Sequence, residues 1–255
     1  MRILLVNDDG ILAPGLSALW SAVADMGEVT VVAPETSQSA AGRSLTLHGP
    51  VICNHVHVGG QFHGVSVAGR PVDCVKLAIR ELMDSRPDLV LSGINAGENV
   101  GVNVFYSGTV SAGAEGALFG IPSVAFSLAG AGEMDFRRAG RLCRQVLDVL
   151  LSGSIAPGEL VNVNIPALSQ STPRGVKVVP QSTAAISETY RRENDADGRM
   201  IFQLNDHFEH GPQDTETDVT ALAEGFITVT PLMSDMTDHN RLGHFQQCRW
   251  GNSQR

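Results

Sequence analysis

The feature that most constrains this chain is an alternation, up to about residue 165, of short apolar runs with longer segments of helical period. The apolar runs have the length of buried strands, and we expect them at Ile3–Val6, Val29–Ala33, Leu89–Ser92, Ser123–Ser127 and Leu160–Ile165. The helical segments lie between them, at Gly15–Met26, Val72–Asp84, Val110–Phe119 and Phe136–Leu151. This order predicts a three-layer αβα fold, in which helices cover both faces of a doubly wound, mostly parallel, Rossmann-like sheet.

Three further short runs lie between the second and third of these strands, at Ser44–Leu47, Val51–Val58 and Gln61–Val67. The last two are separated by Gly59-Gly60, a pair that is typical of a tight hairpin turn. We therefore expect a small antiparallel addition near the parallel sheet.

The composition of the sequence changes near Pro180, where the periodic spacing of apolar residues weakens and polar residues become more frequent. We divide the chain into an α/β core at residues 1–179, an extended C-terminal hairpin arm for oligomerisation at 180–224, and a final core strand with a tail at 225–255. Within the last part we expect the strand at Gly225–Thr230 and a short helix between Met233 and Trp250. A mobile surface loop is the alternative for residues 180–224, although loops this long usually have a function.

Net charge and the spacing of the cysteines limit the partners that the protein can bind and the cellular compartment in which we expect it. The chain has 18 Lys and Arg against 27 Asp and Glu, and its net charge is −9. An acidic chain lacks the basic surface that binds nucleic-acid backbone or anionic membrane, so we expect neither as a partner. The acidic pair soon after the N-terminus argues against a signal peptide, and the four cysteines are widely spaced, so we expect a cytoplasmic protein with reduced, mostly buried thiols.

Polar residues follow several of the predicted strands, and ligands of doubly wound sheets bind at the carboxyl ends of the strands. The first strand is followed by Asn7-Asp8-Asp9-Gly10. Two adjacent carboxylates in a tight turn repel one another unless a cation or strong hydrogen-bond donors compensate them, so a divalent metal is the economical explanation. The alternative is that Asp9 caps the next helix and Asp8 is only solvated.

Three more loops carry related chemistry. Residues 33–44 form a loop of small hydroxyl residues with a single cation, Arg43, and residues 93–99 offer the side-chain oxygen of Asn95 beside glycines. Residues 106–116 begin a helix with small residues, including Ser107, Gly108 and Thr109, and a helix start of this kind can bind an anion. Each loop also has a purely structural alternative. Residues 33–44 would then be an ordinary polar connection, residues 93–99 a turn, and residues 106–116 a helix start with a plain N-cap.

Together these loops supply oxygen ligands and no His or Cys, which favours magnesium, manganese or calcium. The predicted reaction is hydrolysis of a phosphate ester, with Arg43 and the helix start stabilising the developing charge. Neither a Walker A motif nor a Gly-x-Gly-x-x-Gly fingerprint is present. Receiver domains also place an acidic pair after their first strand, but Gly93 occupies the position of their phospho-accepting aspartate.

The loops in order resemble the SurE family of stationary-phase survival proteins, which are metal-dependent 5′-nucleotidases. The matching stretches are Asn7–Ile11, Val31–Pro34, Gln38-Ser39, Gly42–Thr46, Pro71–Val75, Ser92–Asn99, Tyr106–Val110 and Gly225–Leu232. The resemblance implies one divalent cation per subunit, magnesium or manganese, held by Asp8, Asp9, Ser39 and Asn95. It also implies nucleoside 5′-monophosphates as substrates, with 3′-monophosphates and short polyphosphate as further ones.

The resemblance also places Ser107, Gly108 and Thr109 at the phosphate-side loop of the family. We expect Asp8 and Asp9 to be the catalytic residues, and we expect phosphate and substrate contacts from Asn7, Arg43, Asn99, Ser107, Gly108 and Thr109. Family members form dimers or tetramers with a hairpin exchanged between subunits, so we expect a homodimer or homotetramer. The sequence departs from the family at Ala40, where Gly is common, and at Arg70, where Thr is common. A non-catalytic nucleotide-binding regulator is the alternative function.

Overall fold

The structure is a computed structural model, and it describes residues 1–130, 132–153, 155–168, 172–184, 186–187, 189–204, 209–210, 215–248 and 250. The strands that form the main sheet are β1 (Arg2–Val6), β2 (Glu28–Pro34), β3 (Cys53–Val58), β4 (Phe62–Val67), β5 (Leu89–Ala96), β6 (Ser123–Leu128), β7 (Leu160–Ile165), β8 (Val176–Val178) and β13 (Ile227–Leu232). Within the described ranges this sheet has nine strands in the order β3-β4-β2-β1-β5-β6-β7-β13-β8.

The centre of the sheet is parallel and the antiparallel pairings lie toward its edges. Strands β4, β2, β1, β5, β6 and β7 run parallel to one another, β3 pairs antiparallel with β4, and β13 pairs antiparallel with β7. Strand order therefore reverses at β1, which has β2 on one side and β5 on the other. The predicted doubly wound fold and its small antiparallel addition are confirmed, and the addition is continuous with the main sheet through β4.

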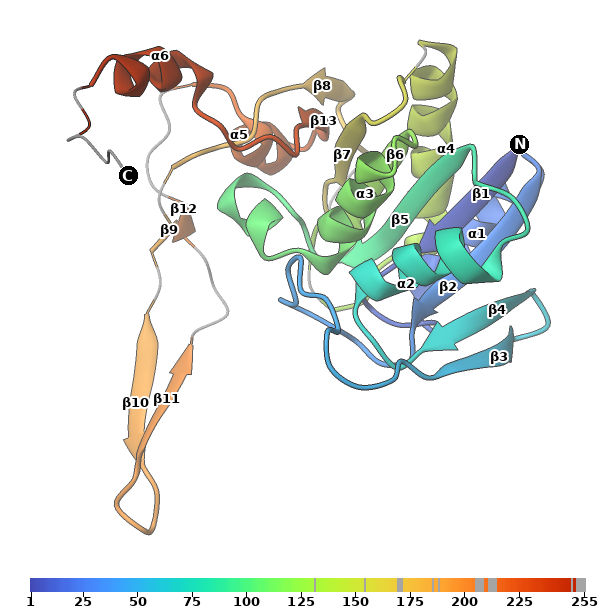
Figure 1. Ribbon diagram of the computed structural model, residues 1–255, viewed down its shortest axis with the longest axis horizontal. Helices are drawn as coiled ribbons and strands as arrows, with labels where there is room; N and C mark the ends of the chain where they lie inside the picture. Colours follow the sequence, from blue (N-terminus) through green and yellow to red (C-terminus); the bar gives the residue numbers. More distant parts are fainter. Residues whose placement is uncertain are drawn as a thin grey trace.

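Helices cover both faces of this sheet (Figure 1). Helices α1 (Pro14–Val23) and α4 (Phe136–Ser152) bury apolar residues in one core, and α2 (Pro71–Leu77) and α3 (Gly108–Leu118) bury theirs on the opposite face. Strand β1 shows why both faces are apolar, because Ile3 and Leu5 belong to the first core while Leu4 and Val6 belong to the second.

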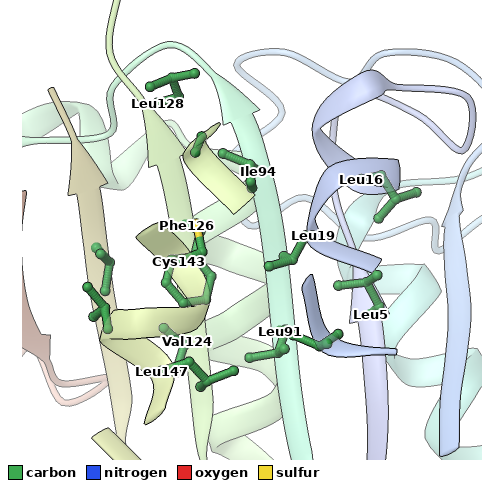
Figure 2. Close-up of a cluster of buried hydrophobic side chains, with 14 of the residues drawn as sticks. Leu5, Leu16, Leu19, Leu91, Ile94, Val124, Phe126, Leu128, Cys143 and Leu147 are labelled. Atoms are coloured by element: carbon green, nitrogen blue, oxygen red, sulfur yellow. The ribbon is translucent and has the colours of Figure 1, made fainter. Parts of the chain in front are cut away.

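The larger core lies between the sheet and helices α1 and α4. Figure 2 shows Leu16 and Leu19 of α1, and Cys143 and Leu147 of α4, directed toward side chains of the central strands. The fully buried Phe126 of β6 lies in the middle of this cluster. Rigid packing of this kind fixes the ends of β1 and β5, from which the site described below is built.

Several local expectations are wrong. Residues 44–47 were expected to form a strand, but they belong to a loop. The side chains of Leu45 and Leu47 are exposed there and are not part of the core. The helix expected at Val72–Asp84 is α-helical only to Leu77 and continues as a π-helical turn, η1 (Ala78–Leu82). Cys53 and Cys248 are exposed, while the other two cysteines are buried as expected.

Other elements were not predicted. Strand β8 extends the sheet beyond β13, a 3-10 helix η2 (Gly101–Phe105) precedes α3, and α5 (Asp218–Ala223) lies within the segment assigned to the arm. The start of α5 carries a sequence signal in Thr217, whose hydroxyl accepts a hydrogen bond from the N–H of Thr220 in a capping box. The short helix expected in the tail is present as α6 (His239–Gln247), which has no buried residue.

Strands β10 (Tyr190–Asn194) and β11 (Met200–Leu204) pair as an antiparallel hairpin that projects from the α/β body (Figure 1). A second short pair joins β9 (Ile186–Ser187) to β12 (Glu209–His210). Among the described residues, no helix is both long and apolar enough to cross a membrane.

Candidate metal and phosphate site

The candidate site lies where the strand order reverses. Strands β1 and β5 are parallel neighbours with Val6 opposite Ser92, so the residues that follow them meet at one edge of the sheet. A cavity of about 680 Å³ opens there. Its lining includes all four residues expected to hold a metal, namely Asp8, Asp9, Ser39 and Asn95.

The turn after β1 is held by internal hydrogen bonds. Asn7 is fully buried and donates from Nδ2 to the carbonyl oxygen of Gly10, at 2.9 Å. This bond closes the turn and places Asp8 and Asp9 at the cavity. Asp9 accepts a hydrogen bond at 3.0 Å from the N–H of Ala96, which ties the β1 turn to the end of β5.

Asn95 is presented by an irregularity in β5. The register between β5 and β6 shifts between Ser92 and Asn95, and a bulge of this kind redirects the side chains beyond it. A Cβ on Gly93 would lie 2.2 Å from the carbonyl oxygen of Phe126, so only glycine fits in the shifted segment. Asn95 donates from Nδ2 to the carbonyl of Gly97 at 2.7 Å, which leaves Oδ1 as the atom that can bind a cation.

The loop that carries Ser39 is held in place by hydrogen bonds at two points along it. The N–H of Gln38 donates to the carbonyl oxygen of Asp8 at 2.7 Å, which brings Ser39 beside the acidic pair. Farther along, the buried carboxylate of Asp73 accepts hydrogen bonds from the N–H and hydroxyl of Thr46, at 3.1 and 2.6 Å. The loop is therefore held against α2 as well as against β1.

The start of α3 contacts Asp8 of the acidic pair. Ser107 caps the helix by accepting a hydrogen bond from the N–H of Val110 at 3.0 Å. The next residue has to be small, because a Cβ on Gly108 would lie 2.7 Å from both Cβ and Oδ2 of Asp8. The buried Thr109 donates from its hydroxyl to Oδ1 of Asp8.

Burial dominates the electrostatics of the acidic pair. Asp8 is only 5% exposed, and burial raises its pKa to about 6, with a smaller rise from the charge of Asp9 and an opposing effect of the Thr109 hydrogen bond. Burial also raises the pKa of Asp9, against the hydrogen bond from Ala96. No Lys or Arg is among the described residues that line the cavity, so no side chain there neutralises the two carboxylates.

Comparison with known proteins identifies the family. A family model described as "Survival protein SurE" matches residues 3–188. The chain belongs to the SurE family.

Curated relatives and a solved structure extend the SurE match over almost the whole chain. A protein named 5′-nucleotidase SurE from Syntrophobacter fumaroxidans is 43% identical over 242 residues, which cover 95% of this chain and 97% of that protein. A protein of the same name from Rhodopirellula baltica is 42% identical over 247 residues, covering 96% of this chain and 98% of that protein. The crystal structure of the SurE protein from Aquifex aeolicus superposes with a TM-score of 0.82 at 37% identity and covers 96% of this chain and 98% of its own.

The donor set of this SurE chain fits a hard divalent cation. Two carboxylates, a hydroxyl and an amide oxygen line one cavity, and they are the ligand types that magnesium and manganese prefer. No group of three or more His, Cys, Asp or Glu side chains is close enough to hold a metal among the described residues, so the set rests on neutral oxygens beside the acidic pair.

The expected substrate contacts are distributed unevenly. Ser107 and Asn99 line the cavity, but Asn7 is buried within its turn, and the exposed Arg43 is not among the lining residues. The hydroxyl of Thr109 is already engaged with Asp8. These positions make Asn7 and Thr109 supports of the acidic pair, because their side chains hydrogen-bond within the site.

Asn99 is fixed on several sides. Its N–H donates to Oδ1 of Asn164 at 2.8 Å, and its Nδ2 donates to Ser127 at 2.9 Å. Its carbonyl oxygen accepts hydrogen bonds from the side-chain amides of Asn162 at 2.7 Å and Asn164 at 3.1 Å. Sequence reasoning missed this buried support; the alternation of Asn with Val in β7 is the one signal that could have indicated it.

Proposed function

We propose that this SurE-family chain is a metal-dependent phosphomonoesterase that hydrolyses nucleoside 5′-monophosphates to nucleoside and phosphate. The single observation that carries the proposal is the convergence of Asp8, Asp9, Ser39 and Asn95 on one cavity beside the start of α3. The 5′-nucleotidase name of relatives that match nearly the whole chain supports the same activity. Nucleoside 3′-monophosphates and short polyphosphate are further proposed substrates.

The four lining oxygens would hold one magnesium or manganese ion per subunit. Such an ion polarises a phosphoryl group and lowers the pKa of an attacking water. The charges of Asp8 and Asp9 would balance that of the ion, and Glu98 is a third carboxylate in the lining of the cavity. Burial raises the pKa of Asp8 to about 6, and a cation beside this carboxylate would favour its ionised form.

The chain itself contributes positioning and charge stabilisation. The N-terminal end of α3 carries the positive end of the helix dipole, and Ser107 lines the cavity at that point. We infer that the phosphoryl oxygens lie there, where developing negative charge is stabilised. Asp9, which is less buried than Asp8, is the proposed helper that accepts a proton from the attacking water.

The same proposal covers assembly and location: a cytoplasmic homodimer or homotetramer. One face of the β10–β11 hairpin carries four apolar side chains, Tyr190 on β10 and Leu204, Phe202 and Met200 on β11, together with Arg192 and Asn194. The four apolar side chains are exposed. A two-stranded hairpin is marginally stable alone, and this supports a second copy of the chain as the partner that covers it. The segment at 180–224 and the strand with tail at 225–255 are then parts of the assembly, around a catalytic core at 1–179.

The test is a matrix of metals and substrates. The purified protein is assayed for phosphate release from a panel of nucleoside 5′- and 3′-monophosphates with magnesium, manganese or a chelator. We expect release from 5′-monophosphates that depends on the added metal and stops with the chelator. Nucleotide binding without release under every metal would contradict the proposal and would favour the non-catalytic regulator.

A further inference from the structure

The cavity that contains the metal-ligand set has one aromatic side chain among its described lining residues, Tyr106. The other lining residues are mostly small or polar, apart from Leu204 of β11. Tyr106 is 55% exposed, and no described residue stacks on its ring or hydrogen-bonds its hydroxyl. An aromatic face is therefore available at the cavity that the acidic pair also lines.

The backbone of Tyr106 is held firmly although its ring is free. Its N–H donates to the carbonyl oxygen of Asn103 at 3.0 Å, and its carbonyl oxygen accepts from the N–H of Gly42 at 3.0 Å. The first bond closes the end of the 3-10 helix η2, and the second joins it to the loop that carries Ser39. A ring on a fixed backbone loses little conformational entropy when a planar ligand stacks on it.

The position of Tyr106 along the chain also suits contact with a nucleotide. It directly precedes Ser107, which caps α3 at the proposed phosphate position. A nucleotide whose phosphate lies at the start of α3 would extend its sugar and base away from the metal ligands. Among the described residues that line the cavity, Tyr106 supplies the one aromatic ring that could meet the base, and Leu204 borders the cavity from the hairpin.

We propose that the nucleobase of the substrate stacks on the ring of Tyr106, with Leu204 as an apolar neighbour. This inference rests on the proposed function. Stacking uses the face of a base and does not distinguish its hydrogen-bonding edge, so this contact accepts every base. Purines have the larger face and are favoured over pyrimidines. The contact confers preference for nucleotides over phosphate esters that lack a base.

The test compares a nucleotide with a base-free ester. KM values for AMP and for ribose 5-phosphate are measured with manganese for the unchanged protein, Tyr106→Ala and Tyr106→Phe. We expect Tyr106→Ala to raise KM for AMP about tenfold or more and to leave KM for ribose 5-phosphate nearly unchanged. Tyr106→Phe should restore the AMP value, because the ring is retained.

Phe105 provides a matched control. It is the neighbouring aromatic residue, it is also 55% exposed, and it does not line the cavity, so Phe105→Ala should change neither KM. If Tyr106→Ala leaves the ratio of the two KM values unchanged, or Phe105→Ala alters it equally, the stacking role is overturned while the proposed function stands. If the unchanged protein releases no phosphate from either ester, the proposed function fails, and the inference that rests on it fails too.

Discussion

The hydroxyl of Thr109, the second residue of α3, donates a hydrogen bond to Oδ1 of Asp8 at the end of β1. Both side chains are buried, so the bond is shielded from water. It orients the carboxylate and favours its ionised form, in opposition to the effect of burial on its pKa. The helix that is proposed to face the phosphate therefore also orients Asp8, the proposed metal ligand.

Thr109→Val should impair the metal site without unfolding the protein. The substitution keeps the shape of the side chain and removes one hydrogen bond to a charged acceptor, a contact worth about 1.5–3 kcal/mol. We expect kcat/KM at a fixed, subsaturating manganese concentration to fall about 10- to 150-fold. Thr109→Ser retains the hydroxyl and is the control. Equal kcat/KM values for the Val and Ser variants would show that the hydrogen bond is unimportant.

Gly108→Ala should disable the site through one methyl group. The added Cβ would lie 2.7 Å from Oδ2 of Asp8, so the carboxylate must move. We expect a loss of phosphate release and weaker manganese binding, measured by calorimetry. The control is Gly243→Ala in α6, where a Cβ meets nothing within 4 Å and activity should be retained. Full activity of the Gly108→Ala protein would contradict the close approach.

The position of the site was predictable because it depends on a general property of parallel sheets. Neighbouring parallel strands end at the same edge, so the polar residues after β1 and β5 had to meet once the order of the strands reversed between them. Asp8 and Asn95 could be brought together in this way without any knowledge of their contacts.

Roles that depend on side-chain direction could not be predicted in the same way. Asn7 precedes the acidic pair in sequence, but its amide turns back to Gly10 and is buried. Tyr106 belongs to a stretch that the sequence analysis singled out. The sequence alone, however, does not indicate that its side chain lines the cavity. Leu45 and Leu47 suggested a strand, but the loop that contains them is held by the hydrogen bonds of Thr46 to Asp73 and remains outside the sheet.

Ala40→Gly should raise thermal stability. Ala40 has φ +56°, and it is the one non-glycine residue with positive φ among those described. The left-handed region costs an L-residue roughly 1–2 kcal/mol, and the greater freedom of glycine in the unfolded chain offsets part of the gain. We expect Tm to rise by about 2–4 °C in calorimetry. The control Ala41→Gly lacks the positive φ and should lower Tm; a fall in both variants would show that Ala40 is unstrained.

Polar substitution on the hairpin should reduce the size of the assembly. Met200 and Phe202 lie on the face that carries the four exposed apolar side chains, whereas Ile201 lies on the opposite face, across from Glu193. We expect the double change of Met200→Ser and Phe202→Ser to lower the mass measured by light scattering. Ile201→Ser is the control and should leave the mass unchanged. An unchanged mass in the double variant would exclude this face from the subunit contact.

The measurement that tests the central claim most directly is the rate of phosphate release from AMP, at saturating manganese, by the unchanged protein and by Asp8→Asn. Asp8 is the buried carboxylate around which the turn after β1, the Ser39 loop and the start of α3 are arranged. If it holds the metal, its loss should lower the rate by about a hundredfold or more. Equal rates for the two proteins would contradict the proposed metal-dependent hydrolysis at this site.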